Sequence, residues 1–98
     1  MHILVVATPK VPVPPEQLGP MLEGAIAWHG RHQDKLLHFG TFPGGGGFGV
    51  VEADDIETFN QMMLEMPFMP VSNHQIFLFQ PGTAGLEQAH KALQAMAS

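Results

Sequence analysis

The sequence has 98 residues, of which 45% are apolar and only 13% are charged. A chain of this length builds one modest core, so we expect a single domain over residues 1–98, with a core unit over 1–80 and an added helix over 83–97. The formal charge of −5 excludes a surface suited to phosphate backbones or anionic lipids. The absence of cysteine excludes disulfides, thiolate nucleophiles and cysteine-based zinc sites. We therefore expect a cytoplasmic protein without nucleic-acid or membrane partners.

The first predicted element is a strand over His2–Thr8, which is apolar without polar alternation and so typical of a strand buried on both faces. The proline-rich segment 10–15 predicts an extended loop. Helical spacing then predicts a helix from Glu16 to about Leu36. Its expected apolar face comprises Leu18, Leu22, Ala25, Ile26 and His29. Pro20 is compatible with this helix only in or near its first turn.

Two strands and a second helix are expected next. Residues 36–42 and 47–53 are typical of strands, and the glycine-rich turn 43–46 joins them into a hairpin. Asp54 and Asp55 offer a helix N-cap. The helix that follows should end before Pro67, and its apolar face should comprise Ile56, Phe59, Met62, Met63 and Met66. These methionines are expected to fill the core or line a pocket.

A fourth strand over 71–80 and a helix over 83–97 complete the chain. The order is βαββαβ plus α, which predicts an α+β ferredoxin-like fold with a four-stranded antiparallel sheet and with the first and third strands at its centre. These two central strands are the most uniformly apolar of the four. One face of the sheet is expected to carry the helices, and the other needs a second apolar cover. A second copy of the chain is the simplest cover, so we expect a homodimer.

The sequence resembles a known superfamily in five places, which are Gly40, the glycine turn after it, the run 50–52, the pair 54–55 and the run 65–70 (EMPFMP). It is similar in these places to the dimeric α+β barrels, and among them to muconolactone-isomerase-like proteins and related small uncharacterised barrels. The resemblance implies a homodimer whose sheets face each other and a pocket between sheet and helices or at the barrel mouth. It implies an acid/base glutamate on the first helix, at Glu23. Ala27 occupies the position at which that family carries a basic residue.

Histidine is the other candidate for proton transfer, because imidazole titrates near neutral pH. His29 and His32 lie three residues apart on the first predicted helix. A metal site there would need a third ligand, which the spacing does not supply, so no metal is expected. His38 and His74 both occupy even-numbered positions on the predicted edge strands, and we expect them to approach each other across the dimer. The glycine run 44–47 lacks the following helix of a phosphate loop and predicts a flexible hairpin tip near a pocket.

These observations predict a cofactor-independent isomerase or cyclase that moves protons on a hydrophobic carbonyl or aromatic substrate. The candidate catalytic residues are Glu23, His29, His32, His38 and His74. The candidate ligand-binding residues are Trp28, Gly45, Gly46, Phe68 and Met69. Two alternatives stay open, namely a non-catalytic dimeric protein that binds a small ligand such as haem, and a monooxygenase of the same superfamily.

Overall fold

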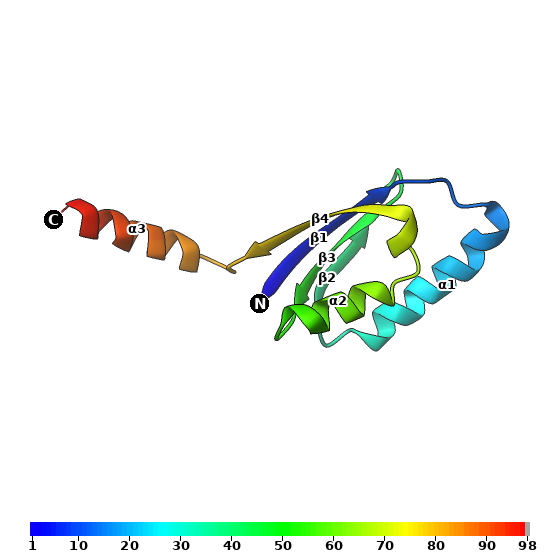
Figure 1. Cartoon of the computed structure of the whole chain (residues 1–98), viewed down its shortest axis with the longest axis horizontal. Coiled ribbons are helices and arrows are strands. Elements are labelled where there is room, and N and C mark those ends of the chain that lie inside the picture. The colour runs from blue at the N-terminus through cyan, green and yellow to red at the C-terminus, as the bar shows by residue number, and fades with distance from the viewer. Residues whose placement is uncertain (98) are drawn as a thin grey trace.

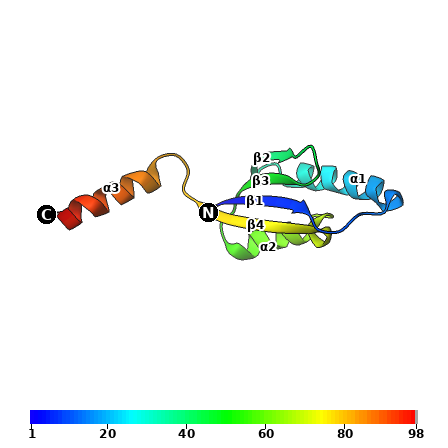
Figure 2. The same ribbon diagram turned by 90° about the horizontal axis from the view of Figure 1, so that it is seen from above.

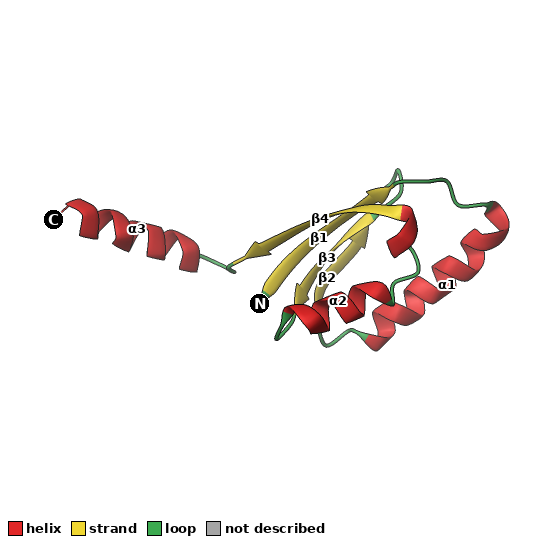
Figure 3. Ribbon diagram, in the orientation of Figure 1, coloured by secondary structure: helices red, strands yellow, loops and turns green. Residues whose placement is uncertain are grey.

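The computed structural model describes residues 1–97 and shows one antiparallel sheet with two helices on one of its faces (Figure 1). The strands are β1 (His2–Pro9), β2 (Leu36–Thr41), β3 (Gly47–Glu52) and β4 (Ser72–Phe79). The helices are α1 (Pro15–Arg31), α2 (Ile56–Leu64) and α3 (Ala84–Ala97), and a 3₁₀ turn, Met69–Val71, precedes β4. Figure 3 shows the alternation of these elements along the chain.

The sheet has the order β2-β3-β1-β4, with every neighbouring pair antiparallel. The first and third strands are therefore central and the second and fourth form the edges, as the sequence predicted for the ferredoxin-like fold. The register pairs Ile3 of β1 with Val51 of β3 and with Leu78 of β4. Because side chains alternate along a strand, this register defines two faces of the sheet.

One face carries the core. Ile3, Val5 and Val51 are buried there against Phe59 and Met62 of α2. Asp55 begins α2 as predicted, because its carboxylate accepts a hydrogen bond from the Thr58 amide at 2.7 Å. This bond is the first cause of a pKa below the ordinary value for the Asp55 carboxyl.

Helix α1 buries only part of the stripe that the sequence predicted, namely Ala25 and His29, which are half-buried. Leu18, Leu22 and Ile26 are exposed, whereas Trp28 is buried and Gly24 approaches Pro67 closely. A Cβ atom added at Gly24 would stand 2.9 Å from the Pro67 ring. The glycine therefore lets α1 lie against the segment after α2, and this contact sets the rotation of the helix. Pro20 also lies beyond the first turn, inside the helix.

The other face of the sheet is open and largely apolar. We call it the open face, and it presents Leu4, Val6, Phe48, Val50, Phe77 and Phe79. Phe77 is half exposed, and the Phe48 ring lies over Gly40 of the neighbouring strand. In the single chain the central strands are thus covered on one side only. The double burial expected for β1 and β3 requires a partner on this face.

The third helix stands apart from this sheet and its two helices. Figures 1 and 2 show α3 extending beyond the end of β4, away from α1 and α2. Within residues 1–97, no helix combines the length and the apolar character needed to cross a membrane.

Candidate functional site

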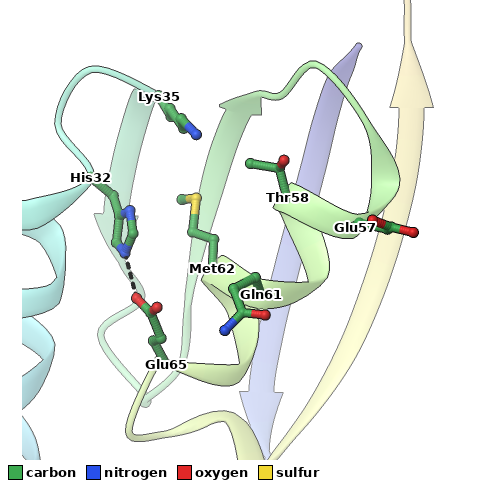
Figure 4. A pocket seen from close by; sticks show the side chains of 7 residues that line it. All are labelled: His32, Lys35, Glu57, Thr58, Gln61, Met62 and Glu65. Carbon is green, nitrogen blue, oxygen red and sulfur yellow. Dashed lines mark hydrogen bonds and ion pairs between the residues drawn. The ribbon is translucent and has the colours of Figure 1, made fainter.

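Two clefts flank α2, and each contains one of the predicted histidines. The polar cleft has a volume of about 360 Å³ and lies between α2 and the end of α1. Its lining residues are His32, Lys35, Glu57, Thr58, Gln61, Met62 and Glu65 (Figure 4). The apolar cleft has a volume of about 300 Å³ and lies between α2 and β4. Its lining residues are Phe59, Asn60, Met63, Leu64, Met69, His74 and Ile76.

A histidine–carboxylate pair is the main chemical feature of the polar cleft. The Nε2 atom of His32 lies 2.9 Å from Oε2 of Glu65, as the dashed line in Figure 4 marks. His32 comes directly after α1 and caps it, since its backbone amide donates to the carbonyl oxygens of Trp28 and His29. Its side chain is only 19% exposed. His32 directly follows α1 and Glu65 directly follows α2, so the ends of the two helices position the pair.

For a neutral imidazole ring, the hydrogen bond to Glu65 selects one tautomer. An ionised carboxylate only accepts hydrogen bonds, so the neutral ring of His32 must donate from Nε2 and leave its lone pair on Nδ1. In this tautomer Nδ1 is the ring nitrogen that is able to accept a proton. The tilted Trp28 ring, whose centroid is 5.5 Å from that of His32, restricts the ring further.

Four other polar side chains line this cleft, and one of them is the carboxylate of Glu57. Lys35 supplies an ammonium group from the turn before β2, while Thr58 and Gln61 project from the exposed side of α2 (Figure 4). An ammonium group and hydrogen-bond donors near a base are suited to a substrate oxygen that gains negative charge. The cleft therefore contains an imidazole together with groups that are chemically able to stabilise an oxyanion.

The sequence analysis did not identify the polar residues that line this cleft with His32. A signal was present, because Thr58, Gln61 and Glu65 recur at i, i+3 and i+7 and so form a polar stripe beside the buried one. The stripe resembles an ordinary solvated helix face. Only the packing of α2 beside the end of α1 shows that this stripe faces a histidine.

The apolar cleft holds two predicted site residues, His74 and Met69. His74 is half-buried on β4 and pairs with Ala7 of β1. His38 is exposed on β2 and pairs with Val50. Since Val50 lies on the open face and Ala7 on the helix side, the two histidines lie on opposite faces of the sheet. A dimer formed through the open faces would bring only His38 into the interface.

The remaining predicted residues line neither cleft. Glu23 is exposed on α1, and the His29 ring packs on Phe39 of β2 with 5.0 Å between ring centroids. Trp28 is a core residue whose Nε1 donates to the Met62 carbonyl at 2.8 Å. Phe68 is half-buried and precedes the 3₁₀ turn.

The glycine turn lies at the far end of β2 from the polar cleft. Gly45 and Gly46 have φ values of +102° and +80°, which favour glycine. A Cβ atom on Gly46 would overlap the Ala7 carbonyl oxygen. These residues thus let the hairpin close against β1. Among residues 1–97, no three histidine or carboxylate side chains gather in a way that would hold a metal ion.

The comparisons with known proteins concern the fold. No protein-family model matches the sequence, and the curated proteins searched give no match. The solved structure of muconolactone isomerase is similar, with a TM-score of 0.70 and 18% identity over 86% of this chain and 95% of that one. A second similar structure is that of the 5-chloro-2-hydroxyhydroquinone dehydrochlorinase of Burkholderia phenoliruptrix AC1100, in complex with 2,5-dihydroxybenzoquinone. Its TM-score is 0.66, with 15% identity over 85% of this chain and 97% of that one. The chain therefore has the ferredoxin-like α+β fold of these two enzymes, the fold that the resemblance in its sequence implied.

Proposed function

We propose that this protein is a cofactor-independent enzyme that transfers protons on a small carbonyl or aromatic substrate, in an isomerisation or elimination. The observation that carries the proposal is the His32–Glu65 pair, 2.9 Å apart, in a cleft that also holds Lys35. The two enzymes of similar fold support the substrate class, because their names specify a lactone and a chlorinated hydroxyhydroquinone. His32 replaces Glu23 as the principal catalytic candidate, since Glu23 is exposed on α1 and lines neither cleft.

In the proposed reaction, Nδ1 of His32 accepts a proton from the carbon next to a substrate carbonyl. The electron pair of the broken C–H bond forms a C=C bond with the carbonyl carbon, the π pair of the C=O bond moves to the oxygen, and Lys35 stabilises the resulting enolate oxygen. Glu65 stabilises the imidazolium through its bond to Nε2. The enolate then either takes the proton back at another carbon, which isomerises the substrate, or expels a leaving group. Positioned bases of this kind contribute about 10²- to 10⁴-fold to a rate.

Deuterium exchange tests this proposal before the natural substrate is known. Unsaturated five-membered lactones and hydroxylated quinones would be incubated with the protein in D₂O, and NMR would follow the loss of the carbon-bound proton. We expect His32→Gln to slow exchange by about 100-fold or more, and Glu65→Gln to slow it less. Asp34→Asn is the matched control for Glu65→Gln, because it removes the same charge from an exposed residue outside the cleft.

Two results would contradict the proposal. Exchange that stays at the wild-type rate in His32→Gln would remove this histidine from the chemistry. A haem-type absorption band in the visible spectrum of the purified protein would favour the alternative of a non-catalytic haem-binding protein.

We further propose that the protein works as a homodimer in the cytoplasm, with the open faces of two sheets packed together. The exposed aromatic side chains of Phe77 and Phe79 support this arrangement. A chain without cysteine is compatible with a reducing compartment.

A further inference from the structure

Helix α3 is an amphipathic helix whose apolar side chains are exposed in the single chain. Its side chains Leu86, Leu93 and Met96 are 72%, 65% and 82% exposed. The described chain measures 65 × 25 × 20 Å, and its radius of gyration is 17.1 Å, whereas about 13 Å is expected for a compact chain of this length. Figures 1 and 2 show the cause, which is a helix that stands off the end of the sheet.

The apolar stripe of α3 has the spacing of a helix that packs along another helix. Leu86, Ala89, Leu93 and Met96 follow one another at intervals of three, four and three residues, which is the a/d pattern of a heptad. Gln88 and Lys91 occupy the opposite side. An apolar stripe as narrow as this can pack into a groove beside a single helix.

The exposed area of the chain is large enough for a stable interface. The chain exposes 6851 Å², whereas a compact monomer of its mass exposes about 5,500 Å². The excess of roughly 1,400 Å² exceeds the roughly 800 Å² that each partner buries in a standard interface. A second copy that covers this excess would restore the surface of an ordinary globular protein.

The linker between β4 and α3 directs the helix away from its own domain. Pro81 has a restricted φ, and Gly82 adopts a φ of +64°. The Gln80 side-chain amide donates to Oε1 of Gln88 at 3.3 Å, and the absence of a side chain on Gly85 leaves room for Gln80. These contacts join the linker to the first two turns of α3.

The same chain carries a groove of matching character. The apolar cleft between α2 and β4 has Leu64 and Ile76 among its lining residues, and these are 72% and 52% exposed. We propose that α3 of each chain packs into the α2–β4 cleft of a second copy, so that two chains exchange their C-terminal helices. Each chain then donates one helix and accepts one, as two-fold symmetry requires. The exchanged helix covers His74, which is otherwise half-buried.

This exchange is independent of the acid/base chemistry proposed above, since it involves the other cleft. A second exposed row, comprising Leu18, Leu22 and Ile26 of α1, is the rival site for α3. It lines neither described cleft.

Cysteine pairs test the exchange, because the natural chain has no cysteine and every disulfide would come from the added pair. The full-length variant Leu64→Cys/Leu93→Cys joins the cleft to α3, and Ile26→Cys/Leu93→Cys joins α3 to the rival row. Each would be oxidised at low protein concentration and run on a non-reducing gel. We expect the first pair to give mostly covalent dimers or larger covalent species, and the second pair to give monomers.

Three results would overturn the proposal. An internal disulfide in the Leu64/Leu93 monomer, visible as faster migration and as loss of free thiols, would show that α3 packs on its own cleft. Efficient cross-linking through Ile26 would place α3 on α1. Free thiols in the Leu64/Leu93 variant after oxidation would show that α3 does not occupy the cleft. As a further check, an equal mixture of Leu64→Cys and Leu93→Cys single variants should give covalent heterodimers.

Discussion

Asp55 is a single residue whose effect on stability depends on pH. Its carboxylate caps α2, and the bond from the Thr58 amide lowers the pKa of the carboxyl below its ordinary value. A lowered pKa in the folded state means that the charged form stabilises the fold above the ordinary pKa, and that this stabilisation is lost as the pH falls through the lowered pKa.

We therefore expect Asp55→Ala to lower the melting temperature at neutral pH, and the difference from the wild type to shrink in strongly acidic solution. Thermal unfolding followed by circular dichroism across this pH range would measure the effect. Asp55→Asn is the control, because an asparagine caps helices about as well as an aspartate and does so without a charge. A difference for Asp55→Ala that is constant with pH would contradict the role given to the charge.

At the scale of elements, one hydrogen bond joins the two helices that cover the sheet. The last carbonyl groups of a helix have no partner within it, and Met62 is near the end of α2. The indole of Trp28, on α1, donates to the Met62 carbonyl at 2.8 Å. Trp28 thus satisfies a buried carbonyl of α2 while it fills the core between the helices.

We expect Trp28→Phe to lower the free energy of unfolding by about 1–3 kcal/mol, because it leaves the buried Met62 carbonyl unpaired. Chemical denaturation would measure the change. Met62→Leu is the control, since it keeps the backbone carbonyl and nearly the same volume and should cost less than about 1.5 kcal/mol. Equal stability of Trp28→Phe and the wild type would show that the bond contributes nothing.

The sequence predicted the order of the elements well, because each element has its own local signal. Pro15 and Asp55 mark helix starts, and the glycine turn marks the hairpin. The sequence did not predict which side of α1 faces the core, because the spacing of Leu18, Leu22 and Ile26 is as helical as that of the stripe through Trp28. The contact between Gly24 and Pro67 decides between the two stripes, and it joins residues 43 positions apart.

The sequence predicted only part of the candidate site, because the site also depends on contacts between residues that are distant in the sequence. His32 was named from the sequence, but Glu65 is 33 residues away and became its partner only through the packing of α2 beside α1. Trp28 was named as a ligand-binding residue, and the structure buries it in the core.

At the scale of the whole molecule, the open face predicts the oligomeric state. Replacing Phe77 by lysine would place a charge on a surface that we propose to be buried in the dimer, and burial of an unpaired charge is strongly unfavourable. We expect light scattering to give twice the mass of one chain for the wild type. Phe77→Lys should shift the equilibrium toward smaller species.

Gln33→Lys is the control for this measurement, because it adds the same charge to an exposed turn away from the open face. A wild-type mass equal to one chain would rule out both the sheet-face dimer and the helix exchange. An unchanged mass for Phe77→Lys would show that the interface lies on another surface.

The strand order also affects how the chain folds. Strand β1 lies at the centre of the sheet, and His2 pairs with Glu52 on one side and with Phe79 on the other. Neither pairing can form locally, because each closes a loop of at least fifty residues. Proteins dominated by such distant pairings fold slowly, in milliseconds to seconds. During synthesis on the ribosome, β1 is made before both of its neighbours, so it stays incompletely paired until β4 has also been made.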